Sequence, residues 1–135
     1  DYVLPFGQAK IVAEGNDLTV VTWGAMVERC EAAAQAIGAI EIIDLRTIVP
    51  WDKTLVLESV RKTGKCLIVH EDISLGGFGA EIAATIAQEA FVYLDGPVER
   101  LAAPSTPVPF STELMEGVVP TVEQIQGRMA DLLAF

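Results

Sequence analysis

The residues best suited to chemistry lie together just after an apolar segment, where the single histidine is followed by two acids. His70, Glu71 and Asp72 end the apolar run that starts at Cys66. Open α/β sheets bind ligands at the carboxyl ends of their strands, so His70 is a candidate general base or substrate contact. The alternative is a structural histidine at a strand end or interface, because no nucleophile stands beside it. The zinc motif H-E-x-x-H is excluded, since Ser74 takes the place of the second histidine.

A glycine-rich turn, Gly76-Gly-Phe-Gly79, follows a few residues later and precedes a helical pattern. Such a turn at a helix N-terminus can cradle an anion such as phosphate. The motif lacks the third glycine of a dinucleotide-binding fingerprint, whose place is taken by Ile82, and it has no Walker-type lysine. Tight turning and close packing of the helix on the sheet explain these glycines without a ligand.

The remaining reactive side chains form no recognisable active site. Ser74, Ser105 and Ser111 are loop serines outside any G-x-S-x-G nucleophile elbow, which argues against a serine hydrolase. Cys30 and Cys66 fall in a helix pattern and a strand pattern, so we expect free, buried thiols in a reducing compartment. One histidine and two distant cysteines cannot close a structural zinc site.

Composition limits the class of protein. The 135 residues suit one compact domain, and 51% hydrophobic residues with a mean hydropathy of +0.41 exclude a disordered chain. The net charge of −10 argues against nucleic acid and anionic lipid as partners and is compatible with a basic protein partner. No apolar run approaches the roughly 20 residues that span a bilayer, so we expect no membrane partner. The chain starts without methionine or a signal peptide, which suggests a fragment or a processed product.

The segments that position these residues alternate between strands and helices. Strands are expected at 18–24, 40–45, 66–70 and 98–103, and helices at 25–37, 52–63, 80–91 and from 121 onward. Asp52 is expected to cap the second helix, and Thr121 with Gln124 to form a capping box for the last. The repeated units predict an α/β fold in one domain, residues 1–135: a three-layer α/β/α sandwich with a mostly parallel sheet of about five strands.

Three finer expectations concern packing. The third helix is expected to bury a wide stripe: Ile82, Ala83, Ile86, Ala87, Ala90 and Phe91. Trp23 and Trp51, each at the end of an element, are expected to anchor the core. The stretch 104–120, with four prolines, is expected to hold little regular structure.

An ordered series of segments carries a family resemblance. The segments are Leu4–Lys10, Glu14–Met26, Ile43–Asp52, Val69–Asp72, Gly76–Ile82, Pro97–Arg100 and Thr106–Pro109. The series resembles the C-terminal domain of transketolase-like enzymes. More narrowly, it resembles that domain in the β subunit of thiamine-diphosphate-dependent 2-oxoacid dehydrogenases, which include pyruvate, branched-chain 2-oxoacid and acetoin dehydrogenases. The likeness covers nearly the whole chain.

The resemblance implies that catalysis takes place outside this chain. In the family, thiamine diphosphate with Mg²⁺ lies between two other domains, and neither fits in 135 residues. We therefore assign no catalytic, cofactor-binding or metal-binding residue and expect this domain alone to be inactive and to bind no cofactor. The parent oxidoreductase decarboxylates a 2-oxoacid and reductively acylates a lipoyl group. The implied location is the cytoplasm, or the mitochondrial matrix in a eukaryote.

The resemblance also implies partners. The domain would support assembly with the other domains and subunits of the dehydrogenase, and we expect at least weak homodimerisation. It would also dock the small subunit-binding domain of the lipoyl acyltransferase. Asp95 and Glu99 match the family's acidic docking positions, and Phe135 would supply a terminal carboxylate if it ends the gene product. The alternative is that these acids are solvated loop charges. His70 matches a histidine of branched-chain-type members and is a candidate interface or active-site-edge residue.

Two other functions stay open at this point. One is the C-terminal domain of a deoxyxylulose-phosphate synthase or a transketolase, which shares the early glycines and the Gly76–Gly79 loop. The other is a free-standing regulatory module that binds a small anion at this loop.

Overall fold

The computed structural model describes residues 2–135 and contains one five-stranded sheet. The strands are β1 (Lys10–Ala13), β2 (Leu18–Thr22), β3 (Ile40–Asp44), β4 (Cys66–Ile73) and β5 (Val98–Ala103). The helices are α1 (Met26–Ala34), α2 (Lys53–Thr63), α3 (Gly79–Glu89), α4 (Thr112–Val118) and α5 (Val122–Leu133), with a short 3-10 helix, η1, at Phe91–Tyr93.

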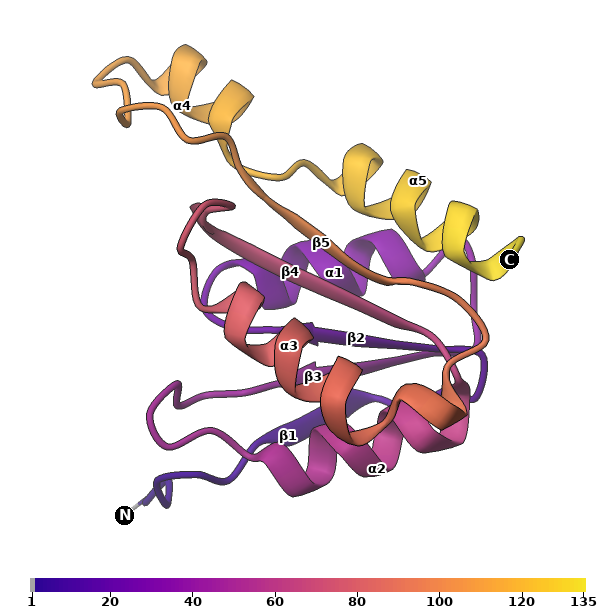
Figure 1. The fold of residues 1–135 in the computed structure, drawn as a ribbon. Coiled ribbons are helices and arrows are strands. Elements are labelled where there is room, and N and C mark those ends of the chain that lie inside the picture. The colour runs from indigo at the N-terminus through magenta and orange to yellow at the C-terminus, as the bar shows by residue number, and fades with distance from the viewer. Residues whose placement is uncertain (1) are drawn as a thin grey trace.

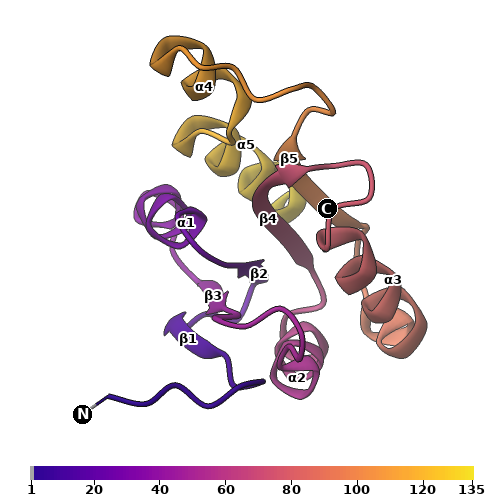
Figure 2. The same ribbon diagram turned by 90° about the vertical axis from the view of Figure 1, so that its left-hand side faces the viewer.

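The sheet order is β1-β3-β2-β4-β5, with β2 to β5 parallel and β1 antiparallel along β3. Helices α1 and α5 cover one face of the sheet, and α2 and α3 cover the other (Figures 1 and 2). This arrangement confirms the predicted three-layer sandwich and its mostly parallel sheet. Within residues 2–135, no helix has the length and apolar character needed to cross a bilayer.

The core has two halves because β2 and β4 are buried on both faces. In β2 and β4, alternate side chains point to opposite layers, as the pleat requires. One half packs under α1 and α5: Leu18, Val20, Leu67, Val69, Met26, Cys30, Ile125, Met129 and Leu132. The other half packs under α2 and α3: Val21, Ile43, Cys66, Ile68, Val56, Val60, Ile82 and Ile86.

Side-chain caps fix the predicted helix starts. Asp52 accepts a hydrogen bond from the amide of Leu55 at 3.1 Å, which confirms it as the N-cap of α2. Its other oxygen accepts from the amide of Ala9 at 3.1 Å, so the same carboxylate holds the N-terminal segment. The capping box of α5 forms as predicted between Thr121 and Gln124.

Three expectations about elements and burial were incomplete or wrong. Strand β1 was not predicted, because four residues give too short a pattern and its pairing with β3 is non-local. Helix α4 lies in the stretch expected to be irregular; it buries none of its residues, so it has no apolar periodicity to read. The buried stripe of α3 is narrower than expected, because Ala87 and Phe91 are exposed. Nothing in the described chain packs on the outer side of that helix.

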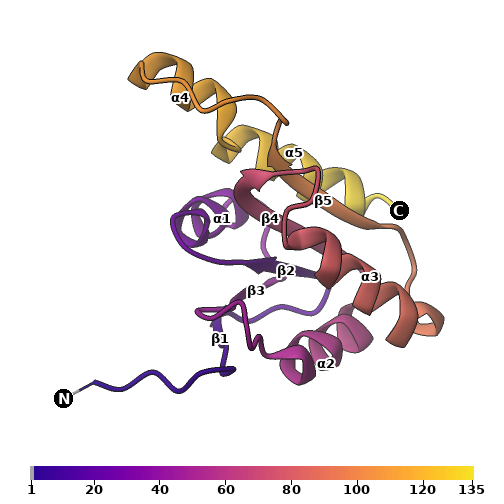
Figure 3. The ribbon, with the colours of Figure 1, turned by 60° about the vertical axis from the view of Figure 1, so that its left-hand side comes forward.

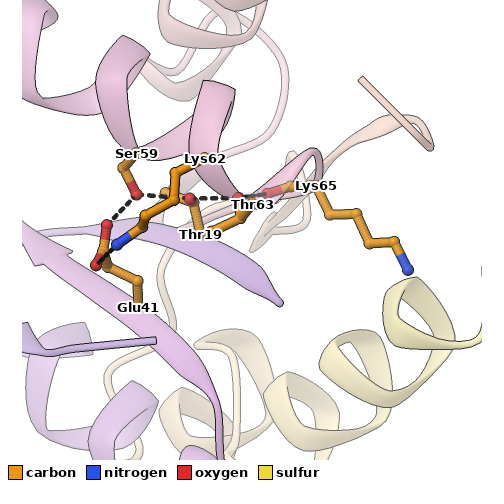
Figure 4. A network of polar contacts seen from close by, with 6 residues as sticks. All are labelled: Thr19, Glu41, Ser59, Lys62, Thr63 and Lys65. Carbon is orange, nitrogen blue, oxygen red and sulfur yellow. Dashed lines mark hydrogen bonds and ion pairs between the residues drawn. The ribbon is translucent and has the colours of Figure 1, made fainter. Parts of the chain in front are cut away.

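A polar network lies inside the layer between the sheet and α2 (Figure 4). Glu41, only 2% exposed, accepts a hydrogen bond from the Ser59 hydroxyl at 2.5 Å and pairs with the ammonium of Lys62. The Thr19 hydroxyl lies 2.6 Å from that of Ser59 and 2.8 Å from that of Thr63. The carboxylate is therefore buried with its charge compensated, which ties α2 to β2 and β3.

Removing the Lys62 ammonium should lower the free energy of unfolding more than removing an exposed cation does. Lys62→Met leaves the Glu41 carboxylate with a hydroxyl partner only, and we expect a loss of about 1–3 kcal/mol in the free energy of unfolding. The matched control is Lys53→Met, which breaks an exposed pair with Glu89 and should cost below about 1 kcal/mol. Urea denaturation measures both variants; equal effects would show that the Glu41 pair contributes no more than a surface pair.

Candidate functional site

The carboxyl ends of β2 and β4 flank the point where the strand order reverses, which is where open α/β sheets form ligand crevices. In this chain two aromatic side chains occupy that point. Trp23 directly follows β2, and its ring stacks on that of His70 in β4, with centroids 5.2 Å apart and planes inclined by 9°. Half-buried Trp23 also packs against the α2/α3 half of the core, as expected. Its stacking on His70 was not predicted, because register alone brings the two residues together.

His70 is fully buried, and neither of its ring nitrogens has a hydrogen-bond partner within residues 2–135. The glycine turn closes over the ring. A Cβ atom at Gly79 would lie 2.4 Å from Nε2, and one at Gly77 would lie 2.8 Å from Cε1 and 2.2 Å from the carbonyl oxygen of Ile73. Both positions therefore require glycine for close approach. This agrees with close packing as the explanation of the motif.

The same turn offers little to an anion. The amides of Ala80 and Glu81 at the start of α3 donate to the carbonyls of Gly77 and Phe78, each at 3.0 Å. The first turn of the helix also carries the Glu81 carboxylate, which repels an anion. The arrangement does not favour the anion-binding alternative.

Burial controls the protonation of the reactive side chains. It lowers the pKa of His70 below its usual value; the Asp72 charge opposes this effect and the Arg100 charge adds to it. The imidazole is therefore neutral at pH 7. Burial also raises the pKa of the Cys30 and Cys66 thiols to about 12, so neither is an activated nucleophile.

Within residues 2–135, no group of three or more His, Cys, Asp or Glu side chains converges to hold a metal ion. Magnesium is often held by only one or two carboxylates together with phosphate oxygens. The expectation that this domain binds neither thiamine diphosphate nor Mg²⁺ therefore stays a prediction.

A second candidate region lies at the amino edge of the sheet, where the chain enters β5 beside the end of α5 (Figure 3). The predicted docking residues meet here in part. Asp95 is exposed, and its amide donates to the carbonyl of Gly64 at 2.8 Å. The Phe135 ring lies against Gly96, where a Cβ atom would be 3.4 Å away. Glu99 instead pairs with Arg128 of α5 at 2.7 Å, so part of its charge is already compensated.

Asp95 also lines two hollows of the surface. A groove of about 820 Å³ lies on one side, between α3 and the start of β5, with walls that include Ala84, Phe91 and Pro97. A hollow of about 500 Å³ lies on the other side, lined in part by Lys65. An exposed carboxylate between two hollows is suited to binding a cationic side chain of a partner that also fills apolar space.

The family described as "Transketolase, C-terminal domain" matches residues 7–125. The chain is 47% identical over 117 residues to 2-oxoisovalerate dehydrogenase subunit beta 2, mitochondrial, of Arabidopsis thaliana, covering 84% of this chain and 33% of that protein. It is 40% identical over 126 residues to the pyruvate dehydrogenase E1 component subunit beta of Rickettsia felis, covering 90% and 39%. The chain thus spans about a third of these relatives.

A solved structure described as "Split gene transketolase, inactive beta4 tetramer" superposes with a TM-score of 0.79 at 24% identity, covering 99% of this chain and 44% of that one. At this identity the likeness shows the fold alone. The sequence relatives favour dehydrogenase β subunits over a synthase or a transketolase.

The close approach of the glycine turn to His70 can be measured as a coupling free energy between Gly79 and His70. Gly79→Ala should destabilise the fold, because its methyl group overlaps the imidazole, and the loss should shrink when His70→Ala removes the ring. We expect a coupling of about 0.5–3 kcal/mol in a double-mutant cycle from urea denaturation. Gly127→Ala, on the exposed side of α5 with open space around it, should instead stabilise by roughly 0.5–1 kcal/mol. Additive losses at Gly79 and His70 would contradict the contact.

Burial of neutral His70 predicts a pH dependence of stability. Since the folded pKa is depressed, the unfolded chain binds the proton first as the pH falls below about 6.5. Stability is therefore complete above this value and is lost below it, by at most about 1.4 kcal/mol per pH unit. In His70→Gln this contribution is absent, so the two proteins should differ less at about pH 5.5 than at about pH 7.5. Urea titrations test this; a constant difference would mean that His70 does not titrate between these values.

Proposed function

Because this chain belongs to the transketolase C-terminal domain family, we propose that it is the assembly and docking domain of a 2-oxoacid dehydrogenase β subunit. The observation that carries this proposal is its 40–47% identity, over 84–90% of the chain, to β subunits of the branched-chain and pyruvate enzymes. The parent reaction is decarboxylation of a pyruvate-type or branched-chain 2-oxoacid with acyl transfer to a lipoyl group. Thiamine diphosphate and Mg²⁺ belong to other domains of the parent enzyme.

His70 has a positioning role in this proposal. Its ring supports the Gly76–Gly79 turn at the carboxyl edge of the sheet, where neighbouring domains of the parent enzyme would pack. Since Arabidopsis thaliana and Rickettsia felis supply a mitochondrial and a bacterial relative, the proposed location is the mitochondrial matrix or the bacterial cytoplasm.

Self-association is proposed at the amino edge. Phe91, Val92 and Tyr93 expose an apolar ridge beside the groove of α3, with 71%, 83% and 50% of their surfaces accessible. Exposed apolar surface of this kind marks contact sites, and a ridge beside a groove can be self-complementary about a two-fold axis. The proposed state is a homodimer of the β subunit within the larger assembly.

Docking of the lipoyl acyltransferase is proposed on the acidic surface at the same edge, formed by Asp95, Glu99 and Phe135. Asp95 is exposed and forms no ion pair within residues 2–135, whereas Glu99 is paired with Arg128. Carboxylates that face lysine and arginine speed encounter and fix register. Asp95 should therefore contribute more to binding than Glu99.

The test measures binding of the full-length subunit to the isolated subunit-binding domain of the acyltransferase. Asp95→Lys/Glu99→Lys should weaken binding by at least about 1–3 kcal/mol, with most of the loss in Asp95→Lys alone. The loss should shrink as salt rises, because exposed charges are screened. Glu31→Lys/Glu58→Lys makes the same change of net charge at exposed sites on α1 and α2 and should bind normally. Unchanged binding of the Asp95/Glu99 variant at low salt would place docking elsewhere.

A further inference from the structure

The 70–79 segment contains the end of β4 and the turn that leads into α3 (Figure 1), and it begins where the regular strand pairing ends. The parallel pairing of β2 with β4 stops at Thr22 and Val69, and the Val69 carbonyl accepts a hydrogen bond from the Thr22 hydroxyl at 2.9 Å. The pairing of β4 with β5 shifts its register between Val69 and Ile73. A displacement of the 70–79 segment would therefore leave the central ladder of the sheet intact.

Few contacts hold this segment from the outside. Ser74 is exposed; its amide donates to the carbonyl of Ala103 and its carbonyl accepts from the guanidinium of Arg100, each at 2.9 Å. Helix α3, which follows, begins without a side-chain cap. Gly76 has a φ of 78° and nothing within 4 Å of its Cβ position, so the turn has a backbone position that is free to pivot. Segments held in this way open locally at a lower free energy than the core.

The His70 ring supplies the inner contact of the segment. It is fully buried, stacks on Trp23 and lies directly under Gly77 and Gly79. Neither ring nitrogen has a hydrogen-bond partner within residues 2–135. A neutral imidazole leaves one N–H donor unpaired in this position, whereas an imidazolium would leave two donors and a full charge without acceptors. The closed position of the ring therefore suits the neutral form.

The charged groups around the ring do not compensate a proton there. The two carboxylates on its own strand, Glu71 and Asp72, are exposed, and so is Glu81 at the start of α3. Strand β5 contributes the Arg100 guanidinium, and the residue after β2 is the uncharged Trp23. Burial lowers the pKa of the imidazole most; the Asp72 charge opposes this effect, and the Arg100 charge adds to it.

We propose that His70 makes the 70–79 segment a pH-sensitive switch at the carboxyl edge of the sheet. The neutral ring holds the segment closed against Trp23. When the ring takes up a proton from solvent, it leaves its buried position for water, and the segment opens while β2 and β4 stay paired. The open form has the higher affinity for the proton, so a falling pH shifts the population toward it. This inference concerns the chain itself and does not depend on the proposed function.

Proton linkage sets the size of the shift. The imidazole of the open form has the ordinary pKa of about 6.5, and the closed form takes up a proton only at lower pH. Between about pH 7.5 and about pH 5.5, the equilibrium constant for opening should therefore rise by up to about tenfold. Carboxylates contribute little to this change, because they titrate near about pH 4.

Hydrogen–deuterium exchange of the full-length protein, measured on peptides by mass spectrometry, follows this opening. After correction for the intrinsic exchange rate at each pH, the amides of residues 71–81 should exchange up to about tenfold faster at about pH 5.5 than at about pH 7.5. At both pH values they should exchange well before the amides of β2, which report unfolding of the core.

The turn that ends α1 is the matched control segment. The amides of Ile37 and Gly38 donate to the carbonyl of Ala34, each at 3.0 Å, so this turn is also held by few hydrogen bonds. The single histidine of the chain lies at the opposite edge of the sheet. The corrected exchange of this turn should therefore change by less than about twofold between the two pH values.

Two variants separate proton uptake from the shape of the side chain. His70→Phe keeps an aromatic ring beside Trp23, and His70→Gln keeps a neutral polar side chain; neither binds a proton in this range. In both, the exchange of residues 71–81 should lose its pH dependence, whatever the overall stability of the variant. Urea denaturation checks that each variant is folded, and the wild-type comparison of the two segments stands without them.

Three results would overturn the proposal. Corrected exchange of residues 71–81 that changes by less than about twofold in the wild type would show that His70 does not control the segment. Exchange of these amides at the same rate as those of β2 would make proton uptake a property of global unfolding. A pH dependence that persists in His70→Phe or His70→Gln would assign it to another group.

Discussion

Strands β2 and β4 are buried on both faces. The positions of the helices and of the exposed apolar side chains follow from this burial. Each central strand sends alternate side chains into two apolar layers, so helices must cover both sides of the sheet. The four covering helices use up the faces of the sheet. What is left for contact with other molecules is the two edges where strands and helices are joined. The arrangement of exposed apolar side chains, confined to these edges, follows from that geometry.

Two stacked rings lie at the point of the sheet where open α/β folds form ligand crevices. The strand order reverses between β2 and β4, which would open a crevice beyond their carboxyl ends. Trp23 and His70 fill it with stacked rings, and Gly77 and Gly79 let the backbone close over the imidazole. A side chain at either glycine would hold the turn away from the ring. The imidazole and the two glycines therefore fix the shape of this end of the sheet together.

The sequence was informative where a pattern is local and uninformative where contacts join distant segments. Strand β5, the Asp52 cap and the Thr121–Gln124 capping box could be predicted, since each is set by neighbouring residues. The pairing of β1, the stacking of Trp23 on His70 and the pairing of Glu99 with Arg128 could not, because they depend on register and on helix placement. The exposure of Phe91 was missed for a related reason: a helical stripe shows where apolar residues lie, and only the tertiary structure shows how much of it is covered.

The charge distribution connects these edges to partners. The chain has 19 acidic and nine basic residues, and its four ion pairs use four of the acids, so most of its carboxylates have no cationic partner within residues 2–135. Asp95 at one edge and Glu71 at the other lie beside hollows of the surface, and neither forms an ion pair within residues 2–135. Acidic groups at an edge attract basic surfaces, so these charges help to select the partner. Two such edges, on opposite sides of one rigid sheet, allow a single small domain to join two different neighbours at once.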